Sequence, residues 1–265
     1  MGRERNADVA RQVANVVGAI FHIVAGMLLA RGEMPGEDIT LIQPSNYAFV
    51  VWAPIFLLCL AYAVYQALPG NRERLLLRRA GWLTATAFFL NGLLVILASP
   101  ERFAVTEGLV VVMLLCLAVA SLCLMRFESG ALGGADSWLV ALPVGHFFGW
   151  ITAATVLGAA QVLVFLGLPA GSPSGALSGA VLLLAGSLFA SAALLAGRNG
   201  PPQGFLAYAG AVLWAFFGIV TNQYDASLIT TGAAVVSAAT VTLVLLRVLS
   251  GGGHGRIAGR GTAQA

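Results

Sequence analysis

The chain has 265 residues; 59% of them are hydrophobic, only 9% are charged, and the mean hydropathy is +0.89. Because an ordinary soluble domain is about half apolar and about a quarter charged, this composition excludes a cytosolic enzyme, a nucleic-acid-binding protein and a disordered chain. It predicts an all-α, polytopic membrane helix bundle. The net charge is +3, and all 14 basic residues are arginine, which excludes Schiff-base chemistry on a lysine.

Eight apolar runs follow one another along the chain, and most of them have the roughly 20 residues that a helix needs to cross a bilayer. They cover residues 13–30, 47–68, 80–98, 104–124, 138–165, 176–196, 205–220 and 226–249. The runs lack the alternating pattern of an outer-membrane barrel, so we expect about eight transmembrane helices. The first run is interpreted as a retained helix, because the sequence Leu-Leu-Ala-Arg at 28–31 is a poor cleavage site for a signal peptide.

Arginine is distributed unevenly over the connections between these runs. With the N-terminus in the cytoplasm, twelve arginines fall on the cytoplasmic side, and only Arg31 and Arg102 fall outside. The cytoplasmic ones are Arg3, Arg5, Arg11, Arg72, Arg74, Arg78, Arg79, Arg126, Arg198, Arg247, Arg256 and Arg260. This split follows the positive-inside rule. It predicts a multi-pass protein of a bacterial-type inner (plasma) membrane with both termini cytoplasmic.

The three cysteines, Cys59, Cys116 and Cys123, all fall in the apolar runs, and no two of them form a Cys-x-x-Cys pair. An odd number of membrane-buried thiols argues against a disulfide framework. We therefore expect neither a metal site nor a cofactor.

Five of the polar residues inside the apolar runs are candidates for function: His22, Asn91, Glu107, His146 and Gln161. Burying a neutral polar group without a partner costs about 2–7 kcal/mol, and an ionisable residue inside a membrane is a candidate for function. Three of the five have two interpretations each. Glu107 either faces a ligand or extends to the outer surface, His22 either acts in a site or packs in the core, and Asn91 either contacts a ligand or joins two helices.

The fifth run carries a concentrated pattern between residues 142 and 155. Gly145 and Gly149 form a GxxxG motif, which lets a neighbouring backbone approach closely. That neighbour is either another helix of the same bundle or a second copy of the chain in a homodimer. His146 and Trp150 lie one helical turn apart, and Trp150 lies roughly 18 Å along the helix from Trp138, near mid-membrane. Trp150 therefore either lines an aromatic pocket or packs in the core.

Three segments share the order and spacing of known motifs: NYAFVVWAPIF at 46–56, FFLN at 88–91 and GWITAAT at 149–155. They resemble the second-, third- and fifth-helix signatures of the TspO/MBR family of tryptophan-rich sensory, or translocator, proteins. The chain is similar to the longer bacterial relatives, which carry extra helices. The resemblance implies a five-helix TspO-like core at 1–165, followed by three additional transmembrane helices at 166–249. The Gly-rich composition of residues 250–265 predicts a disordered tail.

The resemblance also implies a pocket for porphyrins, sterols or other apolar ligands, closed by the first loop. Carried over to this chain, the pocket residues are Trp52, Phe56, Asn91, Phe147, Trp150 and Ala154. His146 joins this set because it lies one turn before Trp150. The tryptophans that follow the third-helix Asn in the family are replaced by Leu93 and Leu94, so porphyrin photochemistry that needs a tryptophan pair is not expected.

Two classes of function follow from these residues. The first is a membrane protein that binds a hydrophobic small molecule, porphyrin-, sterol- or isoprenoid-like, as a sensor or transporter. Its expected partners are an apolar ligand and membrane lipid, with no nucleic acid. The second is a membrane-embedded isoprenoid or meroterpenoid (terpene) cyclase.

The cyclase hypothesis needs a protonated carboxylic acid in an apolar site and aromatic faces that stabilise carbocations. Glu107 is the best acid for this role, with Asp225 and His146 as further candidate catalytic residues. Tyr47, Trp52 and Trp150 would supply the aromatic faces. A simpler interpretation of Asp225 is that its side chain caps the eighth helix.

Overall fold

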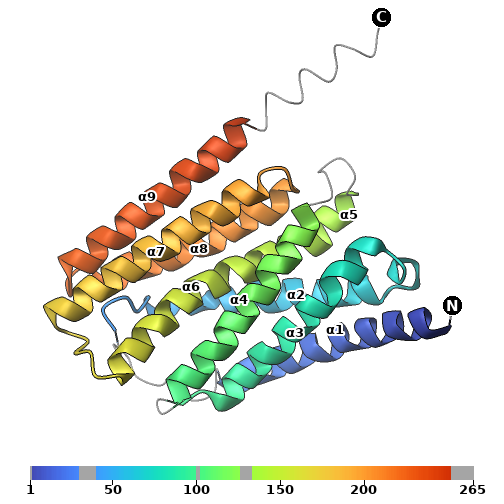
Figure 1. Cartoon of the computed structure of the whole chain (residues 1–265), viewed down its shortest axis with the longest axis horizontal. Helices are drawn as coiled ribbons and strands as arrows, with labels where there is room; N and C mark the ends of the chain where they lie inside the picture. The colour runs from blue at the N-terminus through green and yellow to red at the C-terminus, as the bar shows by residue number, and fades with distance from the viewer. Residues whose placement is uncertain (1, 30–39, 100–101, 126–132, 252–265) are drawn as a thin grey trace, which may run out of the picture.

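The computed structural model describes residues 2–29, 40–99, 102–125 and 133–251, which fold into a helical bundle (Figure 1). Its long helices are α1 (Gly2–Leu29), α2 (Trp52–Ala67), α3 (Leu75–Leu97), α4 (Phe103–Met125), α6 (Leu142–Phe165), α7 (Pro173–Gly197), α8 (Pro202–Gln223) and α9 (Leu228–Gly251). Its short ones are the 3-10 turns η1 (Asn46–Val51) and η2 (Pro69–Asn71), the helical turn α5 (Gly134–Asp136) and the π-helical turn η4 (Ser137–Ala141). Within the described ranges, eight spans are long and apolar enough to cross a membrane. The predicted multi-pass helix bundle is confirmed.

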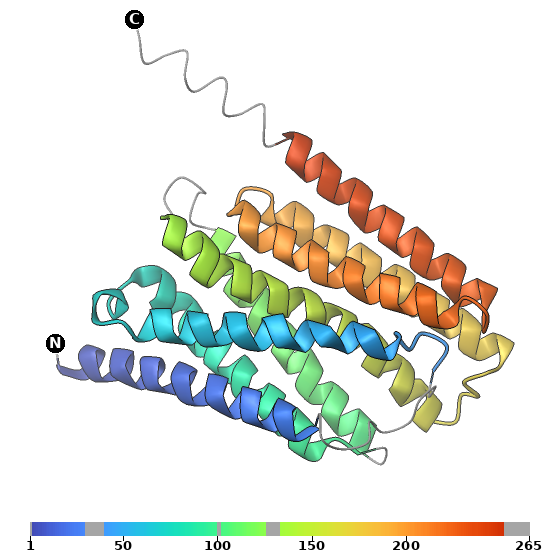
Figure 2. The same cartoon turned by 180° about the vertical axis from the view of Figure 1, so that it is seen from behind.

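Neighbouring helices pack in an order that differs from their order in the chain. Helix α3 lies between α1 and α4, α6 lies between α4 and α8, and α9 covers α7 and α8 (Figure 1). Figure 2 shows α2 on the other side of the bundle, where it contacts α1 and α6. The start of α1 and the end of α9 lie at the same end of the bundle, as an even number of crossings requires.

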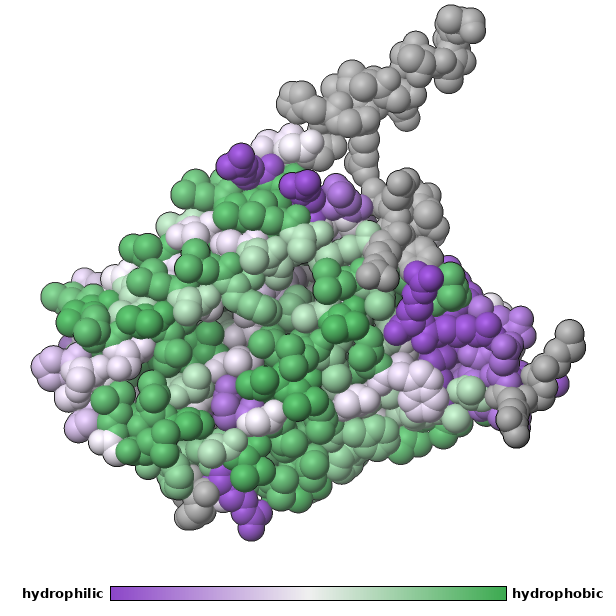
Figure 3. Space-filling view, in the orientation of Figure 1, coloured by the Kyte–Doolittle hydropathy of each residue, from purple (hydrophilic) through white to green (hydrophobic). Residues whose placement is uncertain are grey.

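The surface of the bundle suits a lipid environment. Large hydrophobic side chains such as Leu57, Leu188 and Leu243 are exposed. The space-filling view shows hydrophobic residues in a broad band across the helices, with hydrophilic residues gathered at the end that carries the N-terminus (Figure 3). In a soluble protein such a surface would be an aggregation hazard, whereas in a bilayer it faces hydrocarbon.

Local sequence signals explain where the later helices begin. Pro173 and Pro202 are the first residues of α7 and α8, where a missing amide hydrogen costs nothing. Ser172 caps α7 by accepting a hydrogen bond from the Gly175 amide at 3.0 Å. The prediction that Asp225 caps the last helix is wrong: Asp225 is exposed in the turn before it, and Ser227 accepts the hydrogen bond from the Thr230 amide at 3.3 Å.

The parallel helices α1 and α3 meet through three polar pairs, spaced by about two helical turns. Asp8 forms an ion pair with Arg78, Thr84 donates to Asn15 Oδ1 at 2.8 Å, and Asn91 Nδ2 lies 2.7 Å from His22 Nδ1. Residues seven apart lie near one face of a helix. The three pairs therefore fix which turn of α1 lies beside which turn of α3.

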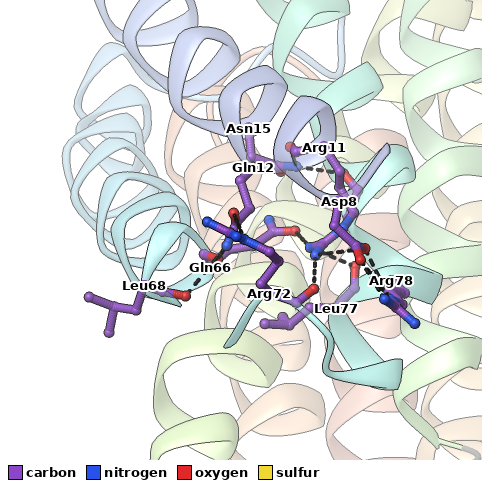
Figure 4. Close-up of polar contacts among 10 residues, drawn as sticks. Asp8, Arg11, Gln12, Asn15, Gln66, Leu68, Arg72, Leu77 and Arg78 are labelled. Carbon is purple, nitrogen blue, oxygen red and sulfur yellow. Dashed lines mark hydrogen bonds and ion pairs between the residues drawn. The ribbon is translucent and has the colours of Figure 1, made fainter. Parts of the chain in front are cut away.

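Arg11, on the same face of α1, is almost completely enclosed, with 1% of its surface exposed. Its guanidinium donates to Gln66 Oε1 and to the main-chain carbonyls of Leu77, at 3.2 Å, and Arg72, at 2.7 Å (Figure 4). It also lies 3.5 Å from the Asp8 carboxylate. One side chain of α1 thus joins the end of α2, the connection after it and the start of α3.

The GxxxG motif of α6 is used inside the bundle. A Cβ atom on Gly145 would overlap main-chain atoms of Gly204, and one on Gly149 would overlap the Tyr208 carbonyl group. Both neighbours belong to α8, so the two helices approach until their backbones are in contact. Of the two interpretations of this motif, packing within the bundle is the one that the structure shows.

Candidate ligand cavity

A cavity of about 400 Å³ lies in the half of the bundle away from the two chain ends. It is bordered by the second half of α1, the segment before α2, the start of α2, the end of α3, the start of α4, and parts of α6 and α8. Its lining residues are Gly26, Gln43, Pro44, Phe49, Trp52, Phe56, Asn91, Leu94, Val95, Ala98, Ser99, Phe103, Thr106, Glu107, Val110, Trp150, Ala153, Ala154, Leu157, Gly158, Gln161, Ala215 and Ile219. This volume is within the range of small-molecule sites.

Four aromatic side chains form one part of the cavity lining. Trp52 and Phe56, one turn apart on α2, are stacked with ring centroids 5.6 Å apart. Trp150 on α6 meets Trp52 edge-on at 6.1 Å and Phe49 edge-on at 5.8 Å. The rings therefore border the cavity in several orientations and hold one another in place through edge-to-face contacts.

Asn91 lies at the cavity wall with 1% of its surface exposed, and its amide is held by His22. The His22 ring is fully buried among aromatic side chains, with Phe56 at 4.7 Å and Phe147 at 5.4 Å between centroids. Asn91 Oδ1 has no hydrogen-bond partner within the described part of the chain. His22 thus belongs to the core and orients Asn91. Asn91 joins α3 to α1 and also lies at the cavity wall, while its contact with a ligand stays a prediction.

The Glu107 carboxylate turns inward, toward α6. A Cβ atom on Gly158 would overlap this carboxylate, so the absence of a side chain there makes room for it. Glu107 Oε2 is buried and has no partner among the described residues. Of the two interpretations, extension to the outer surface does not match this position, because the carboxylate lies against a neighbouring helix and lines the cavity.

The cavity brings together five of the predicted ligand-binding residues, which are Trp52, Phe56, Asn91, Trp150 and Ala154, and also Glu107. Their contact with a ligand stays a prediction. They come from four helices. Their side chains line one cavity because α2 and α4 both contact α6, and α3 contacts α4.

Four other predicted residues lie outside the cavity lining. Phe147 is buried between His22 and Phe88. His146 faces α8, where its ring lies near the backbone of Ala207. Tyr47 is 43% exposed, and its hydroxyl bonds Thr221 at 2.7 Å. Asp225 is exposed in the turn between α8 and α9, so the structure does not place this acid beside Glu107.

Sequence reasoning missed several residues of the wall. Gln43 and Phe49 come from the segment before α2, Gly158 comes from α6, and Ala215 and Ile219 come from α8. Phe49 lies inside the 46–56 motif, so the sequence did indicate that it could belong to the cavity wall. A glycine among apolar residues carries no such signal, and the contribution of α8 depends on tertiary packing alone.

The segment before α2 is fixed to α8 by hydrogen bonds. The Ser45 amide donates to the Gly218 carbonyl at 3.0 Å, and Trp214 Nε1 donates to the Ala48 carbonyl at 2.8 Å. The Gln43 carbonyl accepts from the side-chain amides of Asn222 and Gln223. The part of the cavity wall formed by Gln43, Pro44 and Phe49 is therefore held by a helix outside the predicted five-helix core.

A family model described as TSPO-like protein matches residues 12–247. The chain belongs to the TSPO-like family. This confirms the family suggested by the motifs at 46–56, 88–91 and 149–155, and the match continues through α7 and α8 and into α9. No curated protein and no solved structure matches the chain. The division of this TSPO-like chain at residue 165 stays a prediction.

Proposed function

We propose that this membrane protein binds a hydrophobic small molecule in the cavity between α2, α3, α4 and α6, as a sensor or transporter. The observation that carries the proposal is the lining itself: five aromatic side chains and many aliphatic ones enclose about 400 Å³, with a few polar groups between them. Sites for small molecules have this composition, an apolar lining with a small number of placed polar groups. Membership of the TSPO-like family supports the same function.

Replacing Trp150 by alanine is expected to weaken binding of an apolar ligand at least tenfold, about 1.4 kcal/mol. Trp150 is 3% exposed and contacts two other rings of the lining. Its loss removes both buried contact area and an aromatic edge contact worth roughly 0.5–1.5 kcal/mol. The measurement is the dissociation constant of a fluorescent apolar probe in nanodiscs that contain the protein.

Two variants serve as controls for this experiment. Trp150→Phe keeps most of the ring contact and should bind nearly as well as the parent. Trp82 is 48% exposed on α3 and does not line the cavity, so Trp82→Ala should leave the dissociation constant unchanged. Equal binding by Trp150→Ala and the parent would show that the ligand does not occupy this cavity.

A second candidate function is the membrane-embedded terpene cyclase. It is supported by one observation: Glu107, with an unpartnered buried oxygen, shares the cavity with Trp52, Phe56 and Trp150. A carboxylic acid beside aromatic rings is the arrangement that protonation-initiated cyclisation needs. A molecule recovered from the purified protein in cyclised form would favour this function, and one recovered unchanged would favour binding.

We also propose an inner (plasma) membrane of bacterial type with residue 2 and residue 251 on the cytoplasmic side. Arg72, Arg198 and Arg247 lie at the end of the bundle that carries these residues, and Arg102 lies at the opposite end. The positive-inside rule then assigns the first end to the cytoplasm. Reporter fusions after residues 72 and 199 should report cytoplasmic positions, and fusions after residues 99 and 170 should report external ones. The reverse pattern would overturn the orientation.

A further inference from the structure

The described residues that line the cavity include an acidic side chain but no basic one. Of the described residues that line it, Glu107 carries a carboxylate, and none is arginine or histidine. The ion pairs within the described ranges join Asp8 to Arg11 and Arg78, and Arg74 to Asp136, all in the other half of the bundle. The carboxylate of Glu107 therefore has no positive partner in the described part of the protein.

The neutral polar groups of the lining point to the same kind of ligand. Gln43 Oε1 and Asn91 Oδ1 are buried acceptors, and neither has a partner among the described residues. Asn91 is 1% exposed, and His22 holds the other end of its amide. Together with Glu107 Oε2, three unpartnered acceptor oxygens belong to residues of one cavity wall. A buried acceptor without a donor costs about 1–3 kcal/mol, which a ligand that donates hydrogen bonds would recover.

Besides the carboxylate and the acceptor oxygens, the cavity has aromatic rings, which also favour a positively charged ligand. Trp52 and Phe56 lie nearly parallel, at 27°, while Trp150 and Phe49 are turned by about 80° from their neighbours. Cations bind over the faces of such rings within about 6 Å of the centroid, and tryptophan gives the strongest attraction. An anionic ligand would meet the Glu107 carboxylate, and no arginine or histidine among the described lining residues would offset the repulsion.

We propose that the cavity takes a hydrophobic organic cation, an apolar body that carries a protonated amine, with the ammonium group against Glu107 and the apolar body against the aromatic rings. This inference rests on the proposed binding function and names the chemical class of its ligand. Gly158 has a specific part in it, because its missing side chain lets the carboxylate lie against α6 and face the cavity.

The test uses three probes with one ring system and different head groups: 9-anthracenemethylamine, 9-anthracenemethanol and 9-anthracenecarboxylate. Each is titrated at pH 7 into nanodiscs of neutral phosphatidylcholine that hold the full chain, and binding to empty nanodiscs is subtracted. The parent protein is expected to bind the amine at least thirtyfold more tightly than the carboxylate, with the alcohol between them.

Glu107→Gln keeps the shape of the side chain and removes its charge. It should reduce the preference for the amine over the carboxylate at least tenfold and change the affinity for the alcohol less than threefold. Glu73 is exposed at the other end of the bundle, so Glu73→Gln is the matched control and should retain the preference of the parent. Gel filtration of each variant shows that it is folded.

The outcomes separate the two levels of the proposal. If the alcohol and the carboxylate bind the parent as tightly as the amine, the cavity binds apolar molecules, and the assignment of an organic cation is overturned. That assignment is equally overturned if Glu107→Gln retains the full preference. If none of the three probes binds, the proposed binding function itself fails. The relative affinities of the parent protein for the three probes are measured without any variant. They therefore test the assignment of an organic cation even if Glu107→Gln does not fold.

Discussion

Replacing Arg11 by methionine is expected to lower the free energy of unfolding by about 3–5 kcal/mol, which is the cost of removing one partner from a buried charged network. The substitution would leave Gln66 Oε1 and the carbonyls of Arg72 and Leu77 without their donor. Methionine fills much of the same space, so the loss reports the hydrogen bonds and the charge. Cys59 is fully buried, whereas Cys116 and Cys123 are partly exposed, so the reaction of the Cys59 thiol with a dye follows unfolding in mild detergent.

Two further variants make this result specific. Arg5 lies on the same helix but is exposed, so Arg5→Met should leave the unfolding temperature close to that of the parent. Arg11→Lys keeps the charge but replaces the planar fork of donors by a single ammonium group, and it should fall between the parent and Arg11→Met. A methionine variant as stable as the parent would show that Arg11 does not hold α1, α2 and α3 together.

Gly149→Leu should destabilise the bundle by roughly 3 kcal/mol or more. Inserting carbon atoms into a packed core costs about 1–3 kcal/mol where side chains can shift, and here the obstacle is the Tyr208 carbonyl group of α8, which is part of the backbone. Helices α6 and α8 would have to separate along the face that carries Gly145 and Gly204. The measurement is again the unfolding temperature by dye reactivity.

The matched control is Gly210→Leu on α8. A Cβ atom at Gly210 would meet no atom within 4 Å, and leucine favours a helix over glycine by roughly 0.8 kcal/mol. This variant should be as stable as the parent or slightly more stable. If both leucine variants behave alike, close contact between the backbones of α6 and α8 is not what stabilises this part of the bundle.

The fold could be predicted from sequence because two signals agreed. A helix must satisfy its own backbone in lipid, so each long apolar run had one structural solution, and the arginine positions supported an even number of runs. The segment 134–165 shows the limit of this reasoning. Hydropathy starts it near Trp138, but the structure starts it at Gly134 with α5 and continues it through the π-helical turn η4 into α6.

The site could be predicted only where a residue carried its own signal. Asn91 and Trp150 stood out as a polar and a large aromatic residue at membrane depth, and both line the cavity. Tyr47 and His146 stood out in the same way, yet they face α8. Which face of a helix meets the cavity is set by packing between helices, and sequence periodicity is weak in runs that are apolar on every side.

The hydrogen bonds between α8 and the segment before α2 have a consequence for how such a chain can change during evolution. A chain that ended after α6 would lose the supports of Ser45, Ala48 and the Gln43 carbonyl, together with the wall formed by Ala215 and Ile219. Helix α8 therefore cannot be lost, exchanged or altered independently of the shape of the cavity wall. Substitutions on α8, far along the chain from the aromatic residues of α2, are a route by which this protein could acquire a new specificity while its aromatic wall stays the same.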